Sequence, residues 1–181
     1  MKKYTKKMLL LTLLMSLCLI FSACGAASGS DEPETLSFTT KDGLVTIETD
    51  DTWVESEEYT AALTELELVN EDGIALDVYV DVKSDFNMDL KEYNDYSVGL
   101  WEDDEVKLTE EVQLGDTPGY KNVLEYIVDD KNSIVCIYVV DLGDYYVVME
   151  IYSLLSDEEK VVQYADEYAS KIKLAEQDSE Q

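Results

Sequence analysis

The side chains that could carry catalysis are almost all carboxylates. The chain contains 41 aspartates and glutamates and 13 basic residues, all of them lysine, and it contains no histidine. Without histidine and arginine, Ser-His-Asp and Cys-His nucleophiles, histidine zinc sites and arginine phosphate clamps are excluded. A hydrolase could still place two carboxylates across a cleft. Among so many acids such pairs arise by chance, so we expect no catalytic residue and no enzymatic activity.

Acidic clusters could instead bind a hard cation such as Ca²⁺, which prefers several oxygen ligands. They occur at Asp50-Asp51, Glu102–Glu105, Asp129-Asp130 and Asp157–Glu159. None has the spacing of a calcium-binding loop, since the segment Asp130–Ile134 lacks the third acceptor and the glycine. Solvated loops and a helix N-terminus account for these runs. We therefore expect no metal site and no cofactor.

The thiol of Cys136 lies in an apolar run, Ile134–Val140. A cysteine in such a run usually acts as a small hydrophobic residue. A reactive thiol would need a base, typically histidine. Cys18 and Cys24 belong to the N-terminal region, so an internal disulfide is not expected.

The first residues have the organisation of an export signal. Lysines at positions 2, 3, 6 and 7 precede the apolar segment Met8–Phe21. This segment is shorter than the roughly 20 residues that a helix needs to cross a bilayer. A basic head, a short apolar segment and small residues before the cleavage point are typical of a secretory signal peptide. We predict that residues 1–23 form this signal peptide.

Cys24 follows the signal directly. The sequence Phe21-Ser22-Ala23-Cys24 resembles the lipobox of bacterial lipoproteins, with Phe21 where leucine is usual. The resemblance implies cleavage before Cys24, lipidation of its sulfur, and attachment to the extracytoplasmic face of the cell membrane. The alternative is an ordinary signal peptide cut elsewhere, with Cys24 an incidental thiol.

The charge distribution indicates which partners are possible. The whole chain has a formal net charge of −28, and removal of four leader lysines makes the remainder still more negative. Nucleic-acid phosphates and anionic lipid headgroups repel such a chain, so lipid on Cys24 would have to hold it at the membrane. Basic peptides, basic protein surfaces and cations would be attracted. Alternatively, the charge only keeps an exported domain soluble.

Two polar segments frame one predicted domain. Residues 24–35 are small and polar, which is typical of a flexible tether. Residues 175–181 predict a short acidic tail. The roughly 140 residues between them, 36–174, suit a single domain.

Alternating apolar residues predict strands. The run Ile74–Val82 keeps period two with Asp77 and Asp81 on the opposite, wet face. Ser133–Leu142 and Tyr145–Leu154 are apolar on both sides, as in central strands of a sheet covered on both faces. Further strands are expected over 36–40, 44–49, 64–70, 106–114 and 120–128, with turns at Asp42-Gly43 and Asp72-Gly73 and a break over 115–119.

Two helices are predicted to cover this sheet. Asp89–Glu102 places Leu90, Tyr93, Val98 and Trp101 near one stripe. The second helix begins at a capping box of Ser156 and Glu159, and its apolar residues follow at helical spacing as far as Ile172. The predicted fold class is α+β, an antiparallel sheet of about six to eight strands covered by two main helices.

The segment "LVTIETDDTWVE" resembles the opening strand and tryptophan of PsbP-like domains. The helix "DLKEYNDYSVGLW", the turn "QLGDTPGY", the tyrosine-rich strands and the final helix agree in order and spacing, so the resemblance covers Leu36 to Leu174. Asp50-Asp51 stands where the family often has a proline. The resemblance implies an antiparallel sheet between helices. It implies no activity, because these domains mostly bind or assist other proteins.

The leading hypothesis is a lipid-anchored, non-catalytic binding or accessory module for another envelope protein or peptide. The alternatives are a small-ligand or divalent-cation-binding lipoprotein and a hydrolase that uses carboxylates alone. Tyrosines on neighbouring strands would suit an aromatic binding face, although tyrosine also packs well in sheets: Tyr126, Tyr138, Tyr145, Tyr146 and Tyr152. We expect Trp53 and Trp101 to be core anchors, and no ligand-binding residue is identified.

Overall fold

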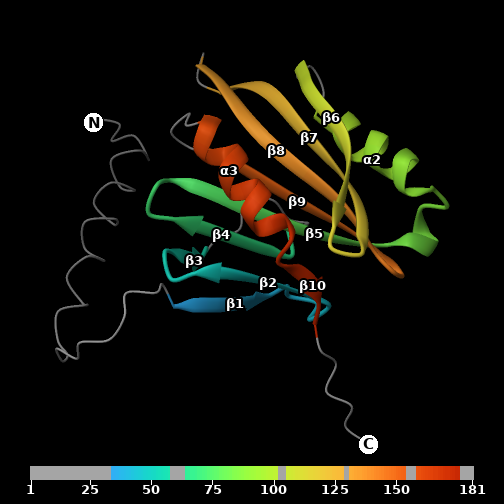
Figure 1. Ribbon diagram of the computed structural model, residues 1–181, viewed down its shortest axis with the longest axis horizontal. Helices are drawn as coiled ribbons and strands as arrows, with labels where there is room; N and C mark the ends of the chain where they lie inside the picture. The colour runs from blue at the N-terminus through green and yellow to red at the C-terminus, as the bar shows by residue number, and fades with distance from the viewer. Residues whose placement is uncertain (1–33, 58–63, 102–104, 129–130, 154–157, 176–181) are drawn as a thin grey trace, which may run out of the picture. The chain divides into compact units, whose positions relative to one another are not determined.

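The computed structural model describes residues 34–57, 64–101, 105–128, 131–153 and 158–175. These ranges contain two antiparallel sheets, of three and seven strands, and two α-helices (Figure 1). In the same ranges, no helix combines the length and the apolar character needed to cross a membrane. The predicted signal peptide, Cys24 and the tether before residue 34 lie outside the described residues.

The smaller sheet has the strand order β1-β2-β10. β1 (Thr35–Thr39) and β2 (Val45–Asp50) form the predicted hairpin, and β10 (Ile172–Leu174) pairs with the other side of β2. The prediction that Ile172 continues a helical face is therefore wrong. The helix ends at Ala169, and Ile172 is buried as a strand residue opposite Ile47. A three-residue strand contains only one repeat of the alternation between apolar and polar residues. So short a pattern cannot be distinguished from helical spacing.

The larger sheet has the strand order β3-β4-β5-β9-β8-β7-β6. Its strands are β3 (Trp53–Glu55), β4 (Leu66–Asn70), β5 (Ile74–Val82), β6 (Glu105–Leu114), β7 (Thr117–Val128), β8 (Lys131–Leu142) and β9 (Tyr145–Ser153). β5 has the predicted bounds. β8 and β9 lie inside the sheet with a paired strand on each side, as their apolar character on both faces predicts.

The predicted break at residues 115–119 is shorter than expected. Gly115, with φ of 64°, makes the turn together with Asp116, and β7 already begins at Thr117. Gly119 is a strand residue that β8 approaches closely, because a Cβ at this position would lie 2.8 Å from the carbonyl oxygen of Val139. This glycine therefore serves strand pairing rather than a turn.

β6 is one of the two outer strands of the larger sheet, the other being β3, and β6 is exposed along most of its length. Its pairing with β7 shifts register between Val106 and Leu108. Its exposed charges include Glu105, Glu110 and Glu111.

The short 3-10 helix η1 (Lys83–Asp85) leads from β5 toward helix α2 (Leu90–Gly99). Asp89 caps α2: its carboxylate accepts from the backbone N–H of Glu92 at 2.9 Å, and Glu92 accepts from the N–H of Asp89 at 3.0 Å. α2 ends at Gly99, before the predicted end at Glu102. Helix α3 (Glu158–Ala169) is present where the second helix is predicted, but its predicted cap, Ser156, lies outside the described residues.

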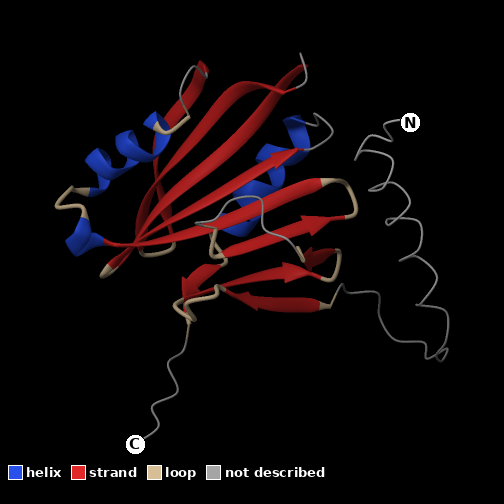
Figure 2. Cartoon of the chain, turned by 180° about the vertical axis from the view of Figure 1, so that it is seen from behind, coloured by secondary structure: helices blue, strands red, loops and turns tan. Residues whose placement is uncertain are grey.

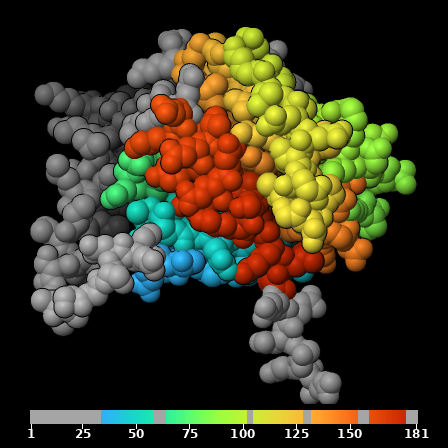
Figure 3. Space-filling view, in the orientation of Figure 1, coloured from blue at the N-terminus to red at the C-terminus, as the bar shows by residue number. Residues whose placement is uncertain are grey.

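The two helices lie on opposite faces of the larger sheet. α3 packs on β8, β9 and β2, and it covers the near face in Figure 3. α2 packs on β7 and β8 from the other side, where Figure 2 shows it at one margin of the sheet. We call these the α3 face and the α2 face. The seven-stranded sheet between two helices confirms the predicted fold class.

Candidate binding groove

A row of three carboxylates crosses the α2 face. Strand register places Glu67 of β4 opposite Asp77 of β5, and Asp77 opposite Glu150 of β9. Residues directly opposite in an antiparallel pair point to the same face, so the three side chains are neighbours. We call Glu67, Asp77 and Glu150 the carboxylate row.

Burial dominates the electrostatics of this row. Asp77 is only 2% exposed, although its alternation in the sequence predicts a wet face. Burial raises the pKa of Asp77 to about 7, and the neighbouring charges of Glu67 and Glu150 contribute to the increase. Burial also raises the pKa of Glu150, against hydrogen bonds from Trp101 and Tyr79 that favour its charged form. At neutral pH, Asp77 is therefore protonated in about half of the molecules.

The two oxygens of Asp77 have different environments. Oδ2 accepts a hydrogen bond from the Tyr152 hydroxyl at 3.3 Å. Oδ1 is buried and receives no hydrogen bond from the described residues. An unpartnered buried oxygen is costly when charged, which agrees with a protonated Asp77.

Beside this row, a groove of about 480 Å³ opens between α2 and strands β5 and β9. Its walls include five aromatic side chains, those of Tyr79, Phe86, Tyr93, Tyr96 and Trp101. Three carboxylates also line it, those of Glu65, Asp81 and Glu150, and none of the described lining residues is basic. An aromatic, acidic cavity of this size is typical of a ligand site.

Local structure positions the aromatic walls. Asn87 adopts the left-handed region with φ of 49°, which asparagine tolerates better than most residues. The chain thereby turns between η1 and α2, and Phe86 packs edge-on against Tyr93 with ring centroids 5.1 Å apart. Tyr93 stacks on Tyr146 at 4.2 Å. Contacts with neighbouring rings therefore hold Phe86 and Tyr93 in place in the absence of a ligand.

Hydrogen bonds hold the carboxylates against these rings. The Tyr93 hydroxyl donates to Asp81, and the indole Nε1 of Trp101 donates to Glu150 at 3.0 Å. Tyr96 and Leu100 at the rim are 42% and 66% exposed. The groove therefore has a fixed polar floor and an exposed apolar rim.

The five tyrosines singled out in the sequence do not form one aromatic face. Tyr126 and Tyr152 pack on the α2 face, as does Tyr146, whereas Tyr138 packs on the α3 face and donates to Asp166 at 2.7 Å. None of the five lines the groove. The tyrosines that do line it, Tyr79, Tyr93 and Tyr96, were missed. The i, i+3 spacing of Tyr93 and Tyr96 on the predicted helix was an available signal.

The two tryptophans have different roles. Trp53 is fully buried on the α3 face, where its Nε1 donates to the Tyr168 hydroxyl at 3.0 Å. This confirms it as a core anchor. Trp101 is a core anchor only in part, because it packs against the apolar residues of the α2 face and also lines the groove.

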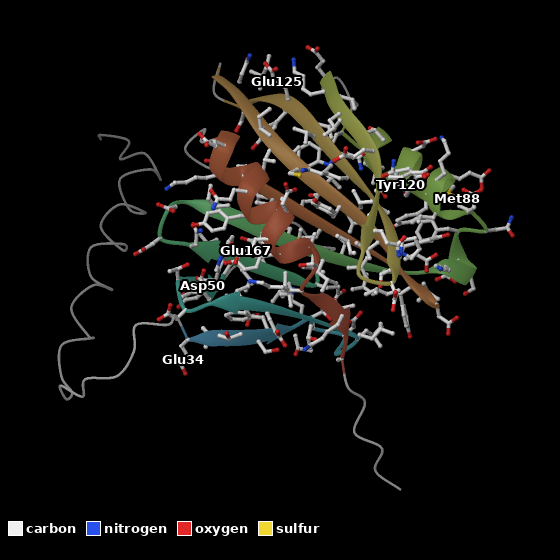
Figure 4. All side chains as sticks on the ribbon, in the orientation of Figure 1. Glu34, Asp50, Met88, Tyr120, Glu125 and Glu167 are labelled. Atoms are coloured by element: carbon white, nitrogen blue, oxygen red, sulfur yellow. The ribbon has the colours of Figure 1, made fainter. Side chains whose placement is uncertain are left out.

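The structure describes the acidic clusters only in part. Asp50 stabilises the turn between β2 and β3 by accepting from the N–H of Thr52 at 2.9 Å, and it accepts from Tyr168 of α3 at 2.8 Å (Figure 4). Residues 102–104, 129–130 and 157 lie outside the described residues. Within the described ranges, no three His, Cys, Asp or Glu side chains are arranged to hold a metal ion.

Cys136 is fully buried, and burial raises the pKa of its thiol to about 12. A thiol with so high a pKa forms little thiolate at neutral pH and reacts slowly. This agrees with its expected role as a small hydrophobic residue.

No protein-family model matches the chain, and no curated protein matches it significantly. Solved structures do match. The solution structure of CyanoP, the cyanobacterial PsbP of Synechocystis sp. PCC 6803, has a TM-score of 0.54 at 14% identity, over 83% of this chain and 98% of that one. The crystal structure of LpqN, described as involved in cell envelope biogenesis of Mycobacterium tuberculosis, has a TM-score of 0.55 at 11% identity, over 80% and 92%.

A protein of Bacteroides thetaiotaomicron VPI-5482 has a TM-score of 0.56 at 10% identity, over 80% of this chain and 49% of its own. At such identities the likeness concerns the fold alone. The predicted resemblance to PsbP-like domains is confirmed at that level. The chain has a PsbP-like α+β fold, in which a large antiparallel sheet lies between two helices.

Proposed function

We propose that this protein is a non-catalytic, extracytoplasmic binding or accessory module, held at the membrane by lipid on Cys24, whose groove binds a segment of another envelope protein or a peptide. The groove carries this proposal, because it combines fixed aromatic walls with carboxylates and an exposed apolar rim. Aromatic side chains with one polar handle are enriched at binding interfaces.

The structural neighbours support an accessory role in a coarse way. LpqN is described as involved in cell envelope biogenesis, and CyanoP is a PsbP protein. The likeness of both proteins to this chain concerns the fold, and a shared fold does not imply a shared activity. The groove carboxylates Asp81 and Glu150 accept from Tyr93 and Trp101, an arrangement that suits recognition.

Membrane attachment can be tested by fractionation. Cys24→Ala removes the only sulfur that the lipobox resemblance marks for lipid, so the variant should leave the membrane fraction. Mass spectrometry of the wild type should show the lipid on Cys24. A processed variant that stays at the membrane would contradict this part of the proposal.

Binding through the groove can be tested by crosslinking in membranes. The double variant Tyr96→Ala and Leu100→Ala removes the exposed apolar rim of the groove. The matched control, Val54→Ala and Leu174→Ala, removes exposed apolar side chains elsewhere, 62% and 45% exposed. We expect crosslinked partners to be lost in the first variant and kept in the second. Equal crosslinking in both would refute the groove as the binding site.

A further inference from the structure

The carboxylates of the groove are arranged around one tyrosine, Tyr79. Because Leu66 pairs with Val78, Glu65, which directly precedes β4, lies beside Tyr79. Asp81 follows two residues later on the same face of β5, and Glu150 lies diagonally across on β9, opposite Asp77. A positive group at Tyr79 would therefore face carboxyl groups from β5, from β9 and from the residue before β4, with no basic residue among the described lining residues to oppose it.

The chain already places its own lysines over tyrosine rings. Lys83 Nζ lies 4.9 Å from the ring centroid of Tyr146 on the α2 face, and Lys171 Nζ lies 4.5 Å from that of Tyr168 on the other face. Tyr146 in turn stacks on Tyr93, a wall of the groove. An ammonium or guanidinium near an aromatic face is attracted by the ring quadrupole. The groove offers the same kind of ring together with carboxylates.

The rim indicates what carries the positive group. Tyr96 and Leu100 expose apolar surface at the opening. A hydrated inorganic cation gains no binding free energy from apolar surface. The alkyl stem of a basic side chain, together with the residues next to that side chain, would bury the apolar surface of the rim. The strongly negative net charge would also attract a basic segment over long range.

We infer that the groove recognises a lysine or arginine side chain of an extended polypeptide, with its positive group at Tyr79 among Glu65, Asp81 and Glu150. This inference rests on the proposed function and names the chemistry of the bound segment. Glu150 has the leading role, because it is fixed by Trp101 within the groove.

The two tryptophans provide an internal control for the test. The indole N–H of Trp101 bonds to Glu150 in the groove, and that of Trp53 bonds to Tyr168 on the α3 face. In the ¹⁵N-labelled full-length chain in detergent micelles, a ligand in the groove should shift the Trp101 indole signal. The Trp53 signal should stay in place.

The probes are Ac-Ala-Leu-Lys-Leu-Ala-NH₂, the same peptide with norleucine in place of lysine, and Nα-acetyl-lysine methylamide. We expect the lysine peptide to shift the Trp101 signal saturably and to bind about tenfold more tightly than the norleucine peptide. Glu150→Gln should weaken the lysine peptide by a similar factor. Glu48→Gln, which removes an exposed carboxylate on β2, should not.

Equal binding of the lysine and norleucine peptides, or equal losses from Glu150→Gln and Glu48→Gln, would overturn the inference while leaving the groove as a binding site. Equal binding of the peptide and acetyl-lysine methylamide would overturn the polypeptide as occupant in favour of a small amine. If no peptide shifts Trp101 but crosslinking still depends on Tyr96 and Leu100, the inference alone fails. If crosslinking is also independent of them, the proposed function fails with it.

Discussion

The two faces of the seven-stranded sheet differ in what they bury. The α3 face buries aliphatic side chains together with Trp53 and Cys136, and α3 and the smaller sheet cover it. The α2 face also buries aliphatic side chains, but it adds tyrosines, two asparagines and the acids Glu67 and Asp77, and α2 packs mainly on β7 and β8. Apolar burial stabilises a fold, whereas buried like charges destabilise it. We therefore expect substitutions on the α3 face to cost the most stability, whereas the α2 face carries the titratable groups on which the proposed binding depends.

The same strands serve both faces. Within β8, Cys136 and Tyr138 lie on the α3 face, and Val135 and Ile137 lie on the α2 face. A register shift of one residue would exchange the two sets. The dry face therefore fixes the register that aligns the carboxylate row on the other side.

The largest expected effect is on the α3 face. Trp53→Ala removes a fully buried ring that packs edge-on against Tyr164 and Tyr168, so it should lower the free energy of unfolding by about 3–5 kcal/mol. Trp101→Ala should cost less than half as much, because Trp101 is partly exposed in the groove. Urea denaturation measures both values. Similar losses would contradict the division between the faces.

The next effect should have the opposite sign. The pKa of Asp77 is about 7 in the folded chain and 3.8 by its ordinary value, so the folded state holds an extra proton between these pH values. Wild-type stability should therefore fall as pH rises from about 4 to about 7. Asp77→Asn should reduce this dependence to the part that comes from Glu150 and, at pH 8, stabilise the chain by on the order of 3 kcal/mol. Urea denaturation of both proteins at several pH values measures this difference. A variant that is less stable than the wild type at pH 8 would contradict the conclusion that burial makes the charged form of Asp77 unfavourable.

Asp50 provides the counterpart beside α3. Burial favours its neutral form, but hydrogen bonds from Thr52 and Tyr168 outweigh burial and lower its pKa. This stability is present above the ordinary pKa and disappears as pH falls through the lowered one. Asp50→Asn should cost about 1 kcal/mol at pH 7 and nothing at the lowest pH that keeps the chain folded. An equal cost at all pH values would assign the effect to geometry rather than charge.

The smallest expected effect concerns the Cys136 thiol, which should not react with an alkylating reagent in the folded chain. Burial raises the pKa of Cys136 to about 12, so iodoacetamide at pH 8 should leave it unmodified in the folded chain and label it after unfolding. Peptide mass mapping distinguishes it from the N-terminal cysteines. Rapid labelling of the native protein would show that the α3 face opens to solvent.

Local pattern was enough for the longer strands, but it missed β3. β5 was predicted to the residue, and the apolar run around Cys136 correctly predicted a strand covered on both faces. Short elements failed for the same reason, since the three residues of β10 carry too few repeats for a period to be measured. The glycine at position 119 led to the wrong prediction of a break in the strand. Its role depends on the close approach of Val139 on the neighbouring strand β8.

The groove could not be predicted because it depends on pairings between distant segments. Period two correctly placed Asp77 and Asp81 on one side of β5. It could not show that β9, some 70 residues later, would bring Glu150 opposite Asp77 and leave it half-buried beside that buried carboxyl group. The sequence contains the groove residues, but their proximity follows from the strand order.

The outer strand β6 has a consequence for how copies of this protein behave together. An unpaired strand edge can join the same edge of another molecule and start an open-ended stack. Here the edge carries glutamates and a register irregularity, which make such joining unfavourable. The β6 edge is therefore poorly suited to edge-to-edge joining between two copies of the chain.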